Sequence, residues 1–215
     1  MNKNSAIKLC ATVVCAASLG GLLSACVPLI VGGAAVGGAL VATDRRTSGA
    51  QLEDEGIELR SIGRINENLG SRVHVNVTSY NRQVLLTGEV PSASDKQLVE
   101  QIVSRVENVR SVANELAVLG ASSLTQRSSD ALITGKVKAA MVDTKDLFAN
   151  AFKVVTERGV VYLMGRVTQR EADRATDIAR STGGVQKVVR LLEIISEEEL
   201  QRTLPAQSPQ TPPKS

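Results

Sequence analysis

The stretch that decides the fold is VNVTSYNRQVLLTGEV, residues 75–90, because its pattern recurs as FKVVTERGVVYLMGRV at residues 152–167. The two copies align without a gap, so that Gly88 falls on Gly165. In the first copy, apolar and polar residues alternate, a turn follows, and a second apolar run returns, which predicts a β-hairpin. An internal repeat of this kind indicates two copies of one structural module.

The residues around each hairpin predict the order helix, strand, strand, helix, strand. The predicted hairpin turns lie at Asn81 and Arg82 in the first copy and at Arg158 and Gly159 in the second. A helix and a further strand follow each hairpin, the first of these strands covering residues 112–118. The chain is therefore predicted to be an α+β protein of two tandem modules, each a three-stranded mixed sheet with two helices packed on one face (αββαβ).

These patterns divide the chain into six predicted segments. The linker is short and polar, which permits either packed or loosely jointed modules, and the end of the chain is polar and Pro-rich, which is typical of disorder. In chain order, the segments are a signal peptide (1–25), a lipidated cysteine with a Gly-rich tether (26–50), the first module (51–119), the linker (120–129), the second module (130–196), and a C-terminal extension with a disordered tail (197–215).

The N-terminus has the layout of an export signal. Lys3 and Lys8 precede a short apolar run that ends in LSAC, which resembles the lipobox of bacterial lipoproteins and makes Cys26 the predicted lipidation site. A transmembrane anchor and an ordinary secretory cleavage site are the alternatives. Because Cys10 and Cys15 would leave with the signal, Cys26 would be the only cysteine of the mature chain, which excludes a disulfide or a cysteine metal site within it.

The residues after Cys26 bear on which membrane holds the protein. In lipoproteins of Gram-negative bacteria, an aspartate directly after the lipidated cysteine commonly retains the protein in the inner membrane, whereas this chain has Val27. The following stretch is apolar and Gly-rich but only about half as long as a spanning helix. The sequence therefore predicts lipid anchorage at the periplasmic face of the outer membrane.

The hairpin that ends in glycine and the GGVQKVV element at residues 183–189 resemble the BON domain, and the resemblance covers both modules. With the lipobox and the tether, the chain resembles the dual-BON-domain outer-membrane lipoproteins of Gram-negative bacteria. The resemblance implies binding of anionic phospholipid by the second module, enrichment at the division septum and support of outer-membrane integrity. It also admits envelope or division proteins as partners.

Residues that could carry catalysis are scarce. The single histidine, His74, lies in a predicted strand, has no second histidine and no evident carboxylate pair, and is interpreted as a surface residue. No nucleophile, phosphate-loop or dinucleotide motif is present. Four aromatic residues and an export signal argue against nucleic-acid binding. We expect no enzyme, cofactor or metal site.

The two modules differ in the charge of their first helices. Acidic residues outnumber basic ones in the first module and basic residues dominate the second, so that an anionic bilayer would attract only the second. The first helix carries several acids and is predicted to pack through Ile57, Ile62 and Ile65. The stretch SDALITGKVKAAMV, residues 129–142, predicts a helix with Asp130 as N-cap and only two charges, both lysines, before Asp143.

The outer side of this second-module helix is the candidate site. Helical spacing places Leu132, Lys136 and Ala139 beside the core face, and an exposed apolar residue flanked by lysines is typical of an interfacial helix. The resemblance to the BON family implies that this helix contacts lipid, with Leu132 nearest to the bulky residue that follows the Ser-Asp start of the family pattern. A tryptophan found there in a related pattern is absent, which implies shallower insertion. The predicted lipid-binding residues are Leu132, Ile133, Lys136, Lys138 and Ala139.

Two other interpretations of this surface stay open. A single exposed leucine is common on soluble proteins and needs no functional explanation. The same surface, or the edge of a three-stranded sheet, could also make the protein a periplasmic interaction scaffold for envelope-assembly or cell-division factors.

Overall fold

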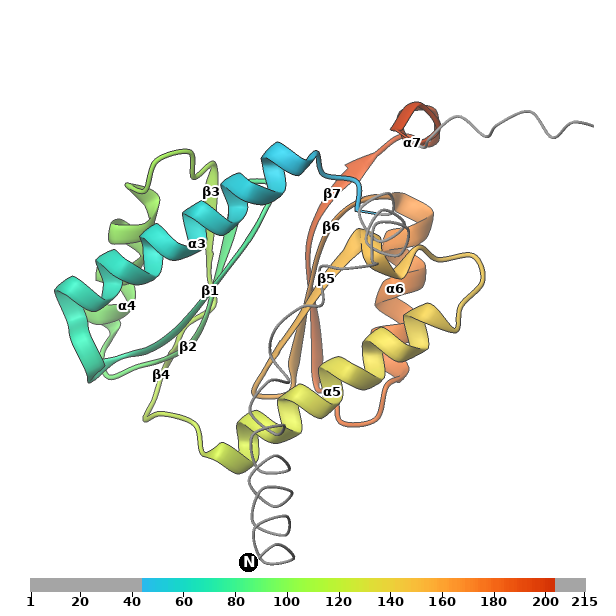
Figure 1. Ribbon diagram of the computed structural model, residues 1–215. Coiled ribbons are helices and arrows are strands. Elements are labelled where there is room, and N and C mark those ends of the chain that lie inside the picture. The colour runs from blue at the N-terminus through green and yellow to red at the C-terminus, as the bar shows by residue number, and fades with distance from the viewer. Residues whose placement is uncertain (1–43, 204–215) are drawn as a thin grey trace, which may run out of the picture. The chain divides into compact units, whose positions relative to one another are not determined.

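The computed structural model describes residues 44–203 (Figure 1). The predicted signal peptide, Cys26, most of the tether and residues 204–215 of the predicted tail lie outside this range. Within it, no helix combines the length and the apolar character needed to cross a membrane.

The first module contains one sheet with helices on one of its faces (Figure 1). Strand β1 is antiparallel to β2, and both β3 and β4 run parallel to β2. The predicted last strand is therefore split in two at residues 115–116, and Leu116 between the two strands is buried in the core. The elements are α3 (Ser48–Leu69), η1 (Gly70–Arg72), β1 (His74–Tyr80), β2 (Gln83–Val90), α4 (Ala93–Ser104), β3 (Ser111–Asn114) and β4 (Ala117–Val118).

The second module repeats this order with an unbroken last strand. Its three-stranded sheet has the order β5-β6-β7, antiparallel between β5 and β6 and parallel between β6 and β7. The elements are α5 (Leu124–Val142), η2 (Ala149–Ala151), β5 (Phe152–Glu157), β6 (Val160–Thr168), α6 (Gln169–Ser181), β7 (Lys187–Ile195) and α7 (Glu197–Thr203). The predicted α+β fold of two repeated modules is confirmed.

Both hairpins turn at the predicted residues and in the same way. The two central residues of each turn have positive φ, 49° and 67° at Asn81 and Arg82 and 51° and 74° at Arg158 and Gly159. This is the backbone geometry of a type I′ turn, whose twist matches that of the flanking strands. Three of these four residues are not glycine, so the turns depend on support from elsewhere in each module.

Three apolar clusters are buried, one inside each module and one between the two sheets. In each module, the first cluster lies between the helices and one face of the sheet. The third cluster joins the opposite faces of the two sheets, and its buried members are Tyr80, Leu85, Tyr162 and Met164. The sequence of the linker permitted either packed or loosely jointed modules, and the structure shows packed modules.

The packing face of α3 differs from the prediction at one position. Ile57 and Ile65 are buried as expected, but Ile62 is 41% exposed, and Ser61 is buried in its place. The reason is the helical repeat. Asp54, Ile57, Ser61 and Ile65 follow one face at intervals of three and four residues, and Ile62 lies 100° beyond Ser61.

Candidate functional site

Helix α5 packs on its sheet through one narrow face. Ile133, Val137 and Met141 recur along this face and are 6%, 0% and 0% exposed. They belong to the core cluster of the second module. Ile133, which the sequence predicts as a lipid-contacting residue, is therefore a core residue and contributes nothing to the outer surface of the helix.

Asp130 also lies on the buried face, and the prediction that it caps the helix is wrong. The helix begins at Leu124, with Ser123 as N-cap, so the second half of the predicted linker is helical. The Asp130 carboxylate instead accepts hydrogen bonds from the backbone N–H groups of Arg158 and Gly159, both at 2.8 Å. The error arose because Asp is a preferred N-cap residue, and the turn that it supports is 28 residues away in the sequence.

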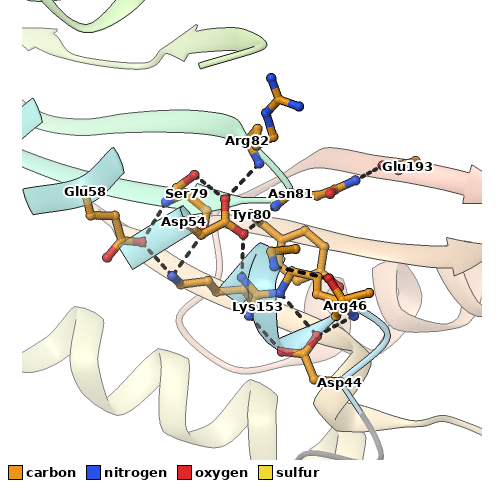
Figure 2. A network of polar contacts seen from close by, with 12 residues as sticks. Asp44, Arg46, Asp54, Glu58, Ser79, Tyr80, Asn81, Arg82, Lys153 and Glu193 are labelled. Carbon is orange, nitrogen blue, oxygen red and sulfur yellow. Dashed lines mark hydrogen bonds and ion pairs between the residues drawn. The ribbon is translucent and has the colours of Figure 1, made fainter. Parts of the chain in front are cut away.

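Asp54 supports the hairpin turn of the first module in the same way. Its carboxylate accepts from the backbone N–H groups of Asn81 at 2.7 Å and Arg82 at 2.8 Å, and from the Ser79 hydroxyl at 2.6 Å (Figure 2). Each first helix is thus tied to the strained turn of its own hairpin by an equivalent aspartate. This tie fixes the rotation of the helix about its axis, and therefore which residues face outward.

The outward face of α5 is exposed and largely apolar. Leu132 is 66% exposed and Val142 is 68% exposed. At 100° per residue, the exposed apolar and small residues fall into one band along the helix, the α5 strip. The α5 strip consists of Leu124, Ala131, Leu132, Gly135, Ala139 and Val142. The structure places the predicted residues Leu132 and Ala139 in the α5 strip, and sequence reasoning missed its two ends, Leu124 and Val142.

Two exposed lysines flank the α5 strip. Helical spacing places Lys136 on one side of the strip and Lys138 on the other. Neither has an ion-pair partner among residues 44–203, nor has Lys145 just after the helix. By contrast, Lys153 on β5 lies 2.8 Å from the carboxylate of Glu58. The lysines beside the α5 strip are therefore available to an external anion.

Helix α3 provides an internal comparison. Aligning Asp54 with Asp130 places Arg60 at the position of Lys136, and Arg60 pairs with Glu53 at 2.6 Å. Helix α3 also exposes apolar side chains, including Leu52 and Leu59, but acidic residues accompany them on the helix. Exposed apolar surface is thus common to both first helices, whereas uncommitted positive charge beside it distinguishes α5.

The surface is hollowed beside the middle of the α5 strip and beside its C-terminal end. A depression of about 180 Å³ lies between Leu132, Lys136 and the loop that contains Gly183 and Gly184. Gly184 has φ +101°, and a Cβ there would lie 3.0 Å from the Ile133 side chain, so glycine allows this loop to approach the helix. A second hollow of about 200 Å³ lies between Val142 and the segment 147–150.

His74 is not the isolated surface residue that the sequence predicts. Its Nδ1 lies 2.8 Å from the carboxylate of Glu89, which is directly opposite on β2 and fully buried. Arg158 of the second module approaches the other carboxylate oxygen at 3.3 Å. The two-residue turn predicted at Asn81 and Arg82 places His74 opposite Glu89, so this cross-strand pair could have been found from the register of the hairpin. Among residues 44–203, no cluster of three or more His, Cys, Asp or Glu residues has a geometry suited to a metal ion.

Comparison with known families identifies both modules. The BON domain matches residues 53–120 and 129–196. The chain is 38% identical to "Outer membrane lipoprotein DolP" of Haemophilus influenzae over 80% of its own length and 90% of that protein. It is also 30% identical to the "21 kDa hemolysin" of Actinobacillus pleuropneumoniae over 71% of its length and 79% of that protein.

Among solved structures, the chain is similar to CdsD, a structural protein of the type III secretion system of Chlamydia trachomatis. The match has a TM-score of 0.29 and 15% sequence identity, and it covers 66% of this chain and 95% of that structure.

Proposed function

Because this chain belongs to the BON-domain family, we propose that it is a non-enzymatic outer-membrane lipoprotein whose second module binds anionic phospholipid through the α5 strip. The observation that carries the proposal is the exposed apolar band on α5 with Lys136 and Lys138 on its two sides, neither of which has an ion-pair partner in the described part of the chain. Apolar side chains would enter the headgroup region, and the lysines would meet lipid phosphates.

Membrane anchorage in this proposal comes from Cys26 and not from the helix. The lipobox-like sequence and the similarity to a protein named as an outer-membrane lipoprotein support acylation of Cys26 at the periplasmic face of that membrane. Each buried CH₂ group of an acyl chain contributes about 0.8 kcal/mol, so several chains hold the protein at the membrane without help. The α5 strip therefore has a different task, which is to respond to lipid composition.

The charge of the two lysines determines how much the affinity for the membrane depends on its content of anionic lipid. A lysine close to an anionic membrane surface contributes about 1 kcal/mol, so Lys136 and Lys138 together contribute about 2 kcal/mol, or about 30-fold in affinity. Such a difference would enrich an anchored protein where anionic lipid is abundant, as we propose for the division septum. In this way the protein would support the integrity of the outer membrane during constriction.

Tryptophan fluorescence tests the lipid contact directly, because the chain contains no tryptophan. A Leu132→Trp variant is mixed with phosphatidylethanolamine–phosphatidylglycerol vesicles whose acyl chains carry bromine, which quenches tryptophan on contact. We expect quenching with these vesicles and little quenching with vesicles of brominated phosphatidylcholine alone. Adding Lys136→Glu and Lys138→Glu to this variant should abolish it. Unchanged quenching in the charge-reversed variant would rule out a role for the two lysines, and absence of quenching in Leu132→Trp itself would rule out the proposed site.

A matched control lies on the first module. Leu59 of α3 is 72% exposed, similar to Leu132, but its helix is acidic. A Leu59→Trp variant should therefore remain unquenched by the same anionic vesicles. Equal quenching at both positions would mean that exposed apolar surface alone explains the binding and that the lysines have no specific role.

An interaction scaffold is the second candidate function, and the exposed leucines of α3 favour it. Leu52 and Leu59 are 69% and 72% exposed on a helix that an anionic membrane would repel. A photoreactive crosslinker at Leu59 in cells should then capture an envelope protein. Under the lipid-binding proposal, a crosslinker at Leu132 should react mainly with lipid, and capture of a protein there instead would favour the scaffold.

A further inference from the structure

The segment that enters the first module contacts both modules through two consecutive arginines. Arg46 binds within the first module, where its guanidinium lies 2.8 Å from Asp54 and 4.3 Å from the centre of the Tyr80 ring (Figure 2). It also pairs with Asp44 at 2.7 Å, which shapes the segment itself. The preceding residue, Arg45, extends to the second module.

Arg45 is almost fully buried against the second module. Its two terminal nitrogens each lie 2.7 Å from one oxygen of the Glu171 carboxylate, and one of them also donates to the Arg166 carbonyl at 3.1 Å. The side chains of Arg45 and Glu171 are 5% and 0% exposed. A two-pronged arginine–carboxylate pair combines strength with a defined orientation.

Glu171 has a place in the second module that does not depend on Arg45. It closes the capping box at the start of α6, where its carboxylate accepts from the Thr168 backbone N–H at 2.9 Å. Burial would raise the pKa of Glu171, but the hydrogen bonds from Arg45 and Thr168 hold it below its ordinary value. The carboxylate is thus a fixed, charged receptor inside the second module, and Arg45 is its counterion.

Arg45 also lies next to one end of the α5 strip. Its guanidinium is 5.8 Å from the centre of the Phe148 ring, and Phe148 lines the same hollow as Val142. Phe148 is itself 47% exposed, which extends the apolar surface beyond the helix. Arg45, which is 19 residues after Cys26 in the sequence, is therefore bound beside the surface that we propose to contact lipid.

We propose that Arg45 is a positioning residue, which binds Glu171 and thereby attaches the lipid-anchored segment to the second module, so that the anchor holds the α5 strip against the bilayer. This inference rests on the proposed function and adds how the strip is oriented. Without the Arg45–Glu171 pair, the entering segment would be bound only through Arg46, to Asp54 and Tyr80 of the first module. The chain between Cys26 and Arg45 reaches at most about 65 Å when extended, so binding of Arg45 beside the α5 strip limits how far the strip can lie from the bilayer.

The test removes the pair without leaving a buried charge. Arg45→Gln is combined with Glu171→Gln, because glutamine still completes a capping box. A control replaces the exposed pair Arg170 and Glu197, 3.6 Å apart, by glutamine in the same way. All proteins carry the Leu132→Trp reporter, and each is prepared in the lipidated form and with Cys26→Ser. Thermal unfolding confirms that each variant is folded.

Three comparisons decide the outcome on the brominated anionic vesicles. In lipidated protein, the Arg45→Gln/Glu171→Gln variant should lose about twofold or more of the tryptophan quenching, and the control pair should lose none. With Cys26→Ser, both variants should be quenched like the parent, because the site itself is intact. Equal quenching of the lipidated variant and its parent would overturn the role of Arg45. Absence of quenching in the unlipidated parent would instead overturn the proposed lipid site.

Discussion

Replacing Asp130 by asparagine should destabilise the second module through the hairpin turn. The carboxylate accepts two backbone N–H groups at 2.8 Å and is 5% exposed. Asparagine keeps one acceptor oxygen but turns an NH₂ group toward the second N–H. Hydrogen bonds to a charged group contribute about 1.5–3 kcal/mol each, so loss of one bond with an unsatisfied donor should cost about 2–4 kcal/mol. For a protein of this size, the melting temperature should fall by about 10 °C.

Thermal unfolding followed by circular dichroism measures this loss, and amide exchange locates it. The N–H groups of Arg158 and Gly159 should exchange faster in Asp130→Asn, whereas amides of the first module should change less. Asp143→Asn provides the control, because Asp143 is exposed at the C-terminal end of the same helix. A melting temperature for Asp130→Asn within about 1 °C of that control would refute the reasoning that the buried carboxylate supports the turn.

Three further predictions concern substitutions elsewhere in the second module. Gly135→Ala should raise stability by about 0.5–1 kcal/mol in urea unfolding, because a Cβ there meets nothing within 4 Å and alanine favours the helix. Gly165→Ala should lower stability in the same assay, because its Cβ would lie 2.5 Å from the Ala151 carbonyl oxygen; an unchanged midpoint would contradict this. Burial and the charge of Glu89 raise the pKa of Glu157, so its ionised form opposes folding. Glu157→Gln should therefore be more stable than the parent at pH 7, with a difference that shrinks as the pH falls toward the ordinary value of 4.5, and a pH-independent difference would exclude this cause.

Much of the fold could be predicted because the signals are local and occur twice. Alternating apolar residues, one short turn and a glycine define the hairpin in each module. Because the pattern occurs twice, the register of one copy supports that of the other. The errors lie where local preference and packing disagree. Asp130 has the chemistry of an N-cap, yet it supports a turn, and Ile62 has the chemistry of a core residue, yet Ser61 takes the inward position.

The candidate site was only partly visible in the sequence for a similar reason. Helical spacing was sufficient to place Leu132 and Lys136 outside the core. It could not show that Lys136 has no ion-pair partner within residues 44–203, whereas Arg60, at the equivalent position, pairs with Glu53. Nor could it show the contact between Arg45 and Glu171, because these residues are 126 positions apart and meet only when the second module has folded.

The third apolar cluster has a consequence for how the two halves of this protein can change. Leu85 and Met164 are fully buried only because each sheet covers the other, so neither module presents a finished surface by itself. A larger or smaller side chain on one sheet would have to be matched on its counterpart, so the two repeats cannot vary independently at this face although they differ in charge. Their outer helices carry no such constraint. The sheet faces of the two modules thus constrain each other, whereas the outer surfaces of α3 and α5 can differ and serve separate functions.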